Sequence, residues 1–300
     1  MEAKQKILII VGPTSSGKSA LAVELAKRFN GEVISADSRQ AYRGLNIGTG
    51  KITKREMQGI PHHLLDVISP NNVFTAYDFA ERAHRTVADI ASRGKLPIVA
   101  GGTGLYIDAL TGRITLQNVK PDPALRVRLS KKPTHQLYEM LILKDPKRAK
   151  AMNTSSERSN KVRLIRALEI ANASDSTPIN DLRCRYDTLW IGIAPPFTLL
   201  EKKIATRLHA RIQQGMVAEA RKLHTVGLSY KRMRELGLEY RWLSLFLQNK
   251  ITKGCMTTEL SRAIRKYAKR QLVYWKRNQH IIWFAKPDVS KISNVIRRWL

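Results

Sequence analysis

A glycine-rich loop near the start of the chain constrains the fold more than any other feature. Residues 7–11 read ILIIV, an apolar and β-branched run typical of a strand buried on both faces. Residues 12–19, GPTSSGKS, satisfy the pattern G-x-x-x-x-G-K-[ST], and Leu21, Leu25 and Phe29 follow at helical spacing. A buried strand, this loop and a helix in that order predict a P-loop in a parallel α/β sheet.

The loop also predicts how a phosphate would be held. Its glycines let the backbone curl, so that N–H groups and the positive end of the next helix point at phosphate oxygens. Lys18 would reach the terminal phosphates as a point charge, and the Ser19 hydroxyl would bind Mg²⁺. The predicted diphosphate- or nucleotide-binding residues are therefore Gly12, Pro13, Thr14, Ser15, Ser16, Gly17, Lys18 and Ser19.

Further apolar runs predict how the sheet continues. The expected strands are 32–37, 96–102, 188–196 and 280–284, and the expected helices are 19–29, 76–94, 198–225 and 260–278. Thr198 and Glu201 have the spacing of a capping box at the start of one of these helices. Strands that alternate with helices predict a P-loop NTPase-like, doubly wound parallel sheet, with its ligand site at the carboxyl ends of the strands.

The pattern changes after about residue 118. Residues 119–186 contain helical patterns and prolines but no clear strand, which predicts a smaller, mostly helical insertion domain between two core segments, 1–118 and 187–300. The stretch 160–173 is an amphipathic basic helix. Its apolar positions, expected to face a partner element, are Val162, Ile165, Leu168 and Ile170.

The charge of the chain is large and unevenly distributed. Of 53 Lys/Arg and 24 Asp/Glu residues, the first 110 residues hold 14 and 10, so nearly all of the formal net charge of +29 lies beyond them. Such a field attracts a polyanion, because each neutralised phosphate releases counterions. This favours a nucleic-acid partner over a small metabolite.

Cysteine usage and hydropathy indicate the compartment. Cys184 and Cys255 form no C-x-x-C pair, which fits a reduced, cytoplasmic setting. The apolar run 7–11 is too short for a signal-peptide core or a membrane span. We therefore expect a cytoplasmic protein without a membrane partner.

Two polar positions follow predicted strands at the edge where the P-loop lies. Asp37 ends the second strand, where an ionised carboxylate acts as a general base or, alternatively, as an ordinary turn cap. The glycines of GGTGLY (101–106) allow a ligand to approach the backbone near Thr103, or simply form a tight turn. The strand before them ends without a carboxylate for Mg²⁺, which argues against plain ATP hydrolysis.

Several motifs together resemble the tRNA dimethylallyltransferase (tRNA isopentenyltransferase) family in its bacterial form. They are GPTSSGKS, DSRQAYRGLNIGTGK, PHHLLD, GGTGLY, the R-x-x-RALE of residues 163–169 and YAKRQ, in that order along nearly the whole chain. The resemblance implies transfer of a dimethylallyl group from its diphosphate to the exocyclic N6 amine of the adenosine 3′-adjacent to the anticodon. It also implies Mg²⁺ as cofactor, and tRNA and dimethylallyl diphosphate as partners. We expect a monomer.

The resemblance assigns roles to individual residues. Asp37 would be the general base, and Thr103 and Arg126 would lie around the transition state. Arg234 would face the diphosphate. The tRNA-binding residues would be Asp37, Ser38, Arg39, Gln40, Val162, Arg163, Leu164, Ile165 and Arg166, and the basic 260–278 helix adds Lys269 and Arg270 as phosphate contacts.

Two other functions remain open at this point. A P-loop small-molecule kinase or other NTP-dependent enzyme would explain the loop, although a small substrate does not require so basic a chain. A non-enzymatic RNA-binding protein with a relic loop would explain the charge, although Lys18, Ser19, Asp37 and Thr103 are all in place.

Overall fold

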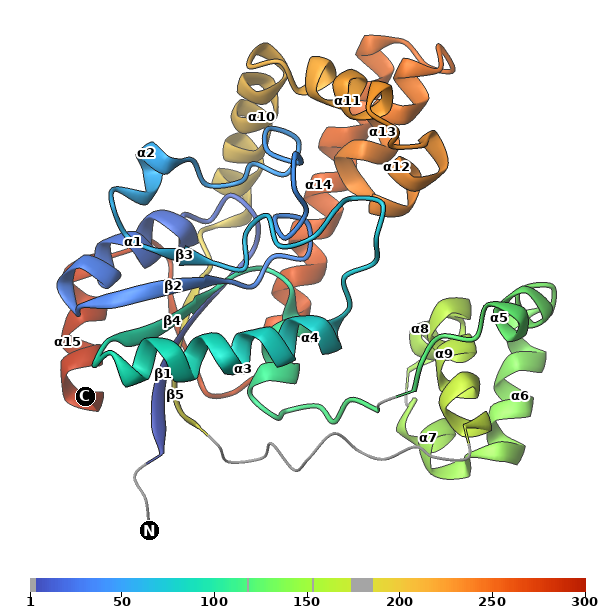
Figure 1. The fold of residues 1–300 in the computed structure, drawn as a ribbon, viewed down its shortest axis with the longest axis horizontal. Helices are drawn as coiled ribbons and strands as arrows, with labels where there is room; N and C mark the ends of the chain where they lie inside the picture. Colours follow the sequence, from blue (N-terminus) through green and yellow to red (C-terminus); the bar gives the residue numbers. More distant parts are fainter. Residues whose placement is uncertain (1–3, 118, 153, 174–185) are drawn as a thin grey trace. The chain divides into compact units, whose positions relative to one another are not determined.

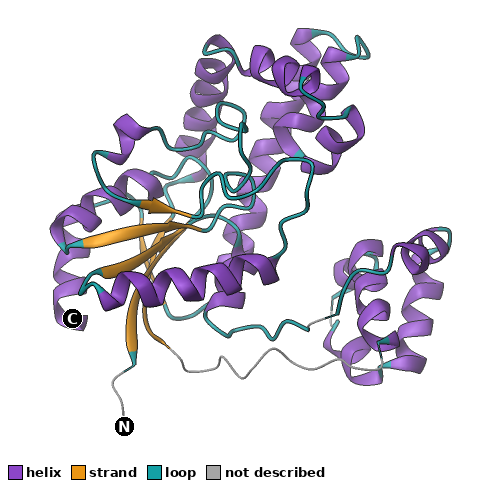
Figure 2. Ribbon diagram, in the orientation of Figure 1, coloured by secondary structure: helices purple, strands orange, loops and turns teal. Residues whose placement is uncertain are grey.

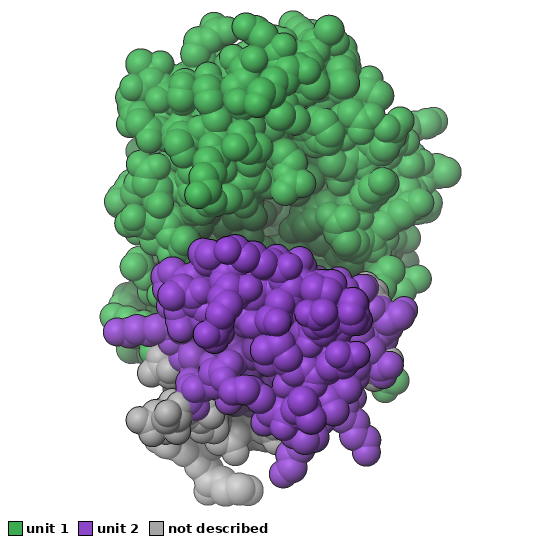
Figure 3. All heavy atoms as spheres, turned by 90° about the vertical axis from the view of Figure 1, so that its right-hand side faces the viewer, with its two compact units in different colours: residues 1–114, 183–300 green, residues 115–182 purple. Residues whose placement is uncertain are grey.

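The chain forms two compact units (Figure 3). Residues 1–114 and 183–300 make up the larger unit, and residues 115–182 the smaller one. The structure is a computed structural model that describes residues 4–117, 119–152, 154–173 and 186–300, so that Cys184 lies outside the described residues. The smaller unit begins and ends four residues before the insertion bounds of 119 and 186 predicted from the sequence.

A parallel sheet forms the centre of the larger unit (Figure 2). Among the described residues it has six strands in the order β3-β2-β4-β1-β5-β6. Their bounds are β1 (Gln5–Val11), β2 (Gly31–Ser35), β3 (His62–His63), β4 (Leu96–Ala100), β5 (Tyr186–Ile193) and β6 (Ile281–Phe284). Strand β1 is central because Ile9 pairs with Val99 of β4 and with Trp190 of β5. This parallel arrangement confirms the predicted fold class.

Helices cover both faces of the sheet (Figure 1). The larger unit contains α1 (Lys18–Arg28), α2 (Lys54–Met57), α3 (Ala76–Ser92), α4 (Gly104–Leu110), α10 (Phe197–Gln213), α11 (Met216–Thr225), α12 (Tyr230–Leu236), α13 (Leu238–Leu247), α14 (Lys253–Trp275) and α15 (Val289–Trp299). Side chains of β1 alternate between the faces. Leu8 and Ile10 pack with α1 and α15, whereas Ile7 and Ile9 share the main core with α3, α10 and α14.

One predicted helix is wrong in its extent. The single helix expected over 198–225 is two helices, α10 and α11, separated at Gly215, whose φ of 99° a glycine adopts without a steric penalty. The predicted capping box is also wrong, because Pro196 occupies the N-cap of α10 and no side chain caps it. A capping box does begin α3, between Thr75 and Asp78.

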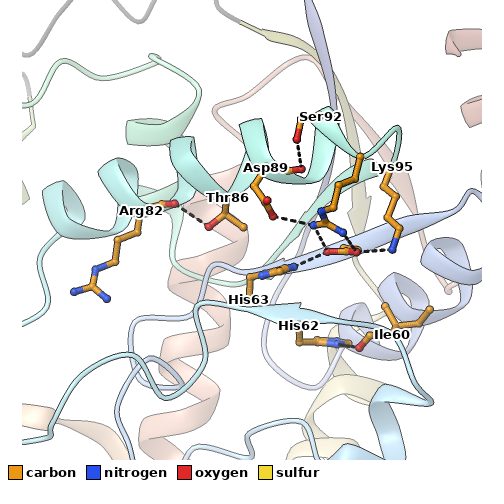
Figure 4. A network of polar contacts seen from close by, with 10 residues as sticks. Ile60, His62, His63, Arg82, Thr86, Asp89, Ser92 and Lys95 are labelled. Atoms are coloured by element: carbon orange, nitrogen blue, oxygen red, sulfur yellow. Dashed lines mark hydrogen bonds and ion pairs between the residues drawn. The ribbon is translucent and has the colours of Figure 1, made fainter.

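A buried carboxylate fixes the edge of the sheet where PHHLLD lies (Figure 4). Glu32 of β2 accepts hydrogen bonds from Arg93 at 2.8 Å and Lys95 at 2.7 Å, and its carboxylate lies 2.8 Å from His63 Nε2. Arg93 in particular holds the pKa of Glu32 far below its usual range, against the opposing effect of burial. His62 contacts the backbone oxygen of Ile60 at 2.8 Å. Both histidines therefore have structural partners.

The smaller unit has a core of its own. It contains α5 (Pro123–Ser130), α6 (Thr134–Lys144), α7 (Pro146–Ala151), α8 (Ser155–Arg158) and α9 (Lys161–Asn172), and its described residues form no strand. Leu129, Leu137, Leu141 and Leu168 are fully or almost fully buried between α5, α6 and α9. The predicted apolar face of α9 is partly wrong, because Val162 is 78% exposed while Ile165 and Leu168 are buried.

Candidate active site

The P-loop connects β1 to α1 at the carboxyl edge of the sheet. Gly12 has a φ of 144°, and a Cβ there would lie 2.3 Å from the backbone oxygen of Ile193, so only glycine fits. Gly17 is the N-cap of α1 at a φ of 95°, and no side chain caps the helix. The first N–H groups of α1 are therefore not consumed by a capping side chain, as an anion site requires.

A cavity of about 460 Å³ opens in front of this loop. The P-loop residues that line it are Thr14, Ser15, Gly17, Lys18 and Ser19. The other three, Gly12, Pro13 and Ser16, are buried and do not line the cavity. The cavity also takes in Asp37, Ser38, Arg39 and Gln40. The structure thus brings the predicted phosphate-binding loop and the predicted base to one place.

Asp37 lies in a turn directly after β2. Its Oδ1 accepts hydrogen bonds from the backbone N–H groups of Arg39 at 2.9 Å and Gln40 at 3.3 Å. These bonds fix the carboxylate while it lines the cavity. The turn-cap interpretation and the general-base interpretation are therefore compatible, because the turn orients the carboxylate.

The glycine turn after β4 braces this segment from the side. Thr103 Oγ1 accepts a hydrogen bond from the backbone N–H of Ser38 at 3.0 Å, and the Thr103 N–H donates to Ala36 O at 3.1 Å. A Cβ at Gly101 would lie 2.1 Å from that same Ala36 oxygen. Thr103 therefore holds the backbone beside Asp37 and is not among the residues that line the cavity.

Gln271 of α14 ties the two glycine-rich loops together. Its side-chain oxygen accepts from the Thr14 N–H at 2.8 Å, and its side-chain nitrogen donates to Gly102 O at 2.9 Å. Gln271 is 6% exposed. Gln271 is the last residue of the motif YAKRQ, and its type and spacing alone do not indicate this bridging role.

The opposite side of the cavity carries cations that the sequence analysis missed. Lys203, Arg207 and Arg211 of α10 line it, together with Glu239 of α13 and Tyr267 of α14. The three basic residues recur every fourth position, and this spacing places them on one helix face. Cations outnumber carboxylates around the cavity, which favours an anionic ligand.

The cavity alters the acidity of the groups inside it. Burial lowers the pKa of Lys18 to about 8, with Asp37 opposing this shift and Arg207 adding to it. The Lys18 ammonium donates to Pro13 O at 2.7 Å. Burial also raises the pKa of Glu239 and of Tyr267. A bound anion would reverse the shift at Lys18 by stabilising its charged form.

Arg234, which the resemblance predicts to face the diphosphate, is not among the residues that line the cavity. It lies half-buried on α12. In this part of the chain, the residues that line the cavity are Leu236, Leu238 and Glu239. The side chains that bring positive charge to this side come from α10 instead.

The predicted residues of the smaller unit lie on α5 and α9. Arg126 donates to the buried Glu169 carboxylate from Nε at 2.6 Å and from Nη2 at 2.8 Å, and Arg166 approaches the same carboxylate at 3.1 Å. Burial would raise the pKa of Glu169, but these arginines hold it below its usual value. Within the segment 162–166 predicted to touch tRNA, Leu164 and Ile165 face the core of the unit, which leaves the side chains of Val162, Arg163 and Arg166 at its surface.

The basic helix α14 has a core face and an outer face. Trp275 is 1% exposed and packs in the main core together with Ile264 and Ala268 of the same helix. Lys269 and Arg270 are exposed, with Lys269 Nζ lying 4.7 Å from the ring centre of Phe197. No helix in the described part of the chain combines the length and the apolar character needed to cross a membrane.

Known proteins resemble this chain over nearly its full length. The family model described as IPP transferase matches residues 40–279. A tRNA dimethylallyltransferase of Leuconostoc citreum is 37% identical, covering 98% of this chain and 99% of its own. A tRNA dimethylallyltransferase of Halalkalibacterium halodurans is 36% identical, covering 96% and 93%.

Solved structures agree with these matches. The full-length tRNA isopentenylpyrophosphate transferase from Bacillus halodurans superposes with a TM-score of 0.74 at 34% identity, covering 99% of this chain and 97% of that one. A eukaryotic dimethylallyltransferase acting on tRNA, at 24% identity, shares the fold with a TM-score of 0.76 over 98% of this chain and 77% of that one. The chain belongs to the IPP transferase family.

Proposed function

We propose that this protein is a tRNA dimethylallyltransferase. It would transfer the dimethylallyl group from dimethylallyl diphosphate to the exocyclic N6 amine of the adenosine 3′-adjacent to the anticodon, releasing diphosphate. The observation that carries the proposal is one cavity lined by a P-loop, an oriented carboxylate and a row of cations. The transferase names of the relatives support it and give no support to the kinase alternative.

The diphosphate would lie at the P-loop. Backbone N–H groups of Ser15 and of residues 17–19 at the start of α1 would meet its oxygens, and Lys18 would supply the nearest charge. The leaving group gains negative charge as its bond to carbon breaks. Lys203 and Arg207 on the opposite side of the cavity would stabilise that charge.

Asp37 would act on the other substrate. An exocyclic adenine amine is a weak nucleophile, so its proton must leave as the new N–C bond forms, and a fixed carboxylate can accept it. Thr103 would keep the 36–38 backbone in place through its two hydrogen bonds. Arg126 would lie near the transition state, as the family resemblance implies. To do so it would give up or share its hydrogen bonds to Glu169.

The donor atoms around the P-loop fit Mg²⁺. The hydroxyl of Ser19 and the carboxylate of Asp37 are hard oxygen ligands that line the same cavity, and Mg²⁺ prefers a few such ligands together with water and substrate phosphates. Ser19 would hold the ion, which would neutralise charge on the diphosphate as it leaves.

The basic surface would bind the tRNA. The target adenosine has to leave its stack to reach a cavity, so the protein must grip the surrounding RNA through phosphate contacts. Candidates are the turn 37–40, the exposed Val162 and Arg163 and the half-buried Arg166 on α9, and the exposed Lys269 and Arg270 on α14.

A single assay tests this function. The protein is incubated with unmodified tRNA, dimethylallyl diphosphate and Mg²⁺, and the tRNA is digested and analysed by mass spectrometry. We expect one added dimethylallyl group on the adenosine after the anticodon. Unmodified tRNA, with phosphate released from ATP in a parallel reaction, would contradict the proposal.

A further inference from the structure

Two arginines on successive turns of α10 meet the same short loop. Arg207 Nη2 donates to Gly50 O at 3.0 Å. Arg211 Nη1 donates to Gly48 O at 3.2 Å, and its Nη2 donates to Thr49 O at 3.4 Å. Both side chains line the cavity. The loop 48–50 therefore holds two guanidinium groups next to each other.

Two like charges this close repel each other unless something compensates them. Glu239 supplies the compensation, because its Oε1 lies 3.3 Å from Arg211 Nη1. The two side chains are 12% and 9% exposed, so water screens them little. Arg207 is the exposed member of the pair, with no ion pair to a carboxylate among the described residues.

The loop is shaped to leave room for both groups. Gly50 has a φ of 57°, and a Cβ there would lie 1.9 Å from Arg211 Nη2 and 2.5 Å from Arg207 Nη2. Glu219 fixes the start of the loop, because its carboxylate accepts hydrogen bonds from the N–H groups of residues 46, 47 and 48 at 3.0, 2.7 and 2.9 Å. The carbonyl oxygens that hold the arginines are thus themselves anchored.

We propose that Arg211 is a positioning residue that sets Arg207 toward the leaving diphosphate. We call Arg211, Glu239 and the loop 48–50 together the Arg211 lock. In this lock, Glu239 and the loop accept the hydrogen bonds of Arg211, which leaves Arg207 as the guanidinium available to the ligand. This inference rests on the proposed function. It assigns Arg211 an effect that passes through Arg207 and not through contact with substrate.

A double-mutant cycle tests the lock. Arg211→Met, Arg207→Met and the double variant are compared by the KM for dimethylallyl diphosphate and by the Kd for inorganic pyrophosphate from calorimetry. We expect each single variant to raise both constants, Arg211→Met by about 10-fold, because an Arg207 that is no longer held in place loses part of a charge-assisted hydrogen bond to the ligand. The double variant should be no worse than Arg207→Met alone, since Arg211 acts only through Arg207.

A second variant and a matched control complete the experiment. Gly50→Ala keeps both arginines but fills their space, and it should reproduce the Arg211→Met values even if Arg211→Met folds poorly. Arg93→Met breaks the remote pair with Glu32; it should lower Tm and leave both constants unchanged. Additive losses in the double variant, or Arg211→Met and Gly50→Ala proteins with a lower Tm and unchanged constants, would overturn the inference. Wild-type protein that binds pyrophosphate but never prenylates tRNA would overturn the proposed function alone.

Discussion

The cavity has two walls that are built differently. The P-loop wall consists of residues 14–19, 35–40 and 100–102, and it presents backbone N–H groups and short side chains from turns at the sheet edge. The helical wall comes from α10, α13 and α14, and it presents long cationic and aromatic side chains. Backbone donors are fixed by the fold itself, whereas long side chains need partners to hold them. The walls should therefore respond differently to mutation.

The largest expected effect lies in the P-loop wall. Asp37→Asn keeps an oxygen that accepts from the Arg39 and Gln40 N–H groups, so the turn should survive. Without a carboxylate to accept the proton, we expect kcat to fall by about 10²–10⁴-fold, with the Kd for dimethylallyl diphosphate unchanged. Single-turnover prenylation of tRNA measures this. Normal turnover by this variant would remove Asp37 as the base.

Removing a charge from the helical wall should weaken diphosphate binding as well as slow the chemical step. Arg207→Met removes one charge-assisted interaction with the diphosphate, and we expect the KM for dimethylallyl diphosphate to rise by about 10- to 100-fold. Lys203→Met is the matched control on the same helix face, with a smaller rise expected from its flexible point charge. Equal effects of the two variants would show that the wall acts only through its total charge.

The pH dependence of binding reports on Lys18. Its pKa of about 8 means that, without a bound ligand, the Lys18 side chain is mostly charged below this pH and mostly neutral above it. A bound diphosphate favours the charged form, so binding above pH 8 must take up a proton. Relative to Lys18→Arg, which shares the titration of pyrophosphate itself, we expect the wild-type pyrophosphate Kd to change little below pH 8 and to rise by about 10-fold per pH unit above it.

Calorimetry in buffers of different ionisation enthalpy measures that proton uptake directly. Lys18→Arg is the control, because a guanidinium stays charged throughout this range and should abolish the pH dependence that belongs to Lys18. A wild-type protein whose proton uptake matches that of Lys18→Arg would contradict the assignment.

The smallest expected effect lies on the outer face of α14, away from the cavity face that carries Tyr267 and Gln271. Lys269→Glu with Arg270→Glu should weaken tRNA binding and reduce the slope of log Kd against log salt by about 2. Prenylation kcat at saturating tRNA should not change. Filter binding at several salt concentrations measures the slope, and an unaltered slope would exclude this face from the interface.

The P-loop wall could be predicted from the sequence, and the helical wall could not. Residues 12–19 and Asp37 stand directly after apolar strands, so local pattern places them at one sheet edge. Lys203, Arg207 and Arg211 also have a pattern, one helix face, but nothing local says that this face turns toward the cavity. Their position depends on how α10 packs on the sheet.

Two other assignments show the same limit of local pattern. Leu164 and Ile165 lie inside a motif that the resemblance links to tRNA, yet they are the apolar face of an amphipathic helix and fill the core of the smaller unit. Arg234 was assigned by the family resemblance, in a segment where the backbone turns at Gly237 with a φ of 75°. Glu239 follows that turn and lines the cavity. Its role as the counter-charge of Arg211 depends on a contact that only the folded structure shows.

The central position of β1 has a consequence for the protein's synthesis. Gln5 pairs with Tyr186, 181 residues later, and Ile9 pairs with Val99 before that. At about 5–20 residues per second, a ribosome needs roughly 10 to 40 s between making β1 and making β5. During that time one edge of the strand Ile7–Val11 has no native partner, which makes it a site for mispairing or chaperone binding. The nascent chain thus carries its central strand without its β5 partner until the smaller unit has been translated.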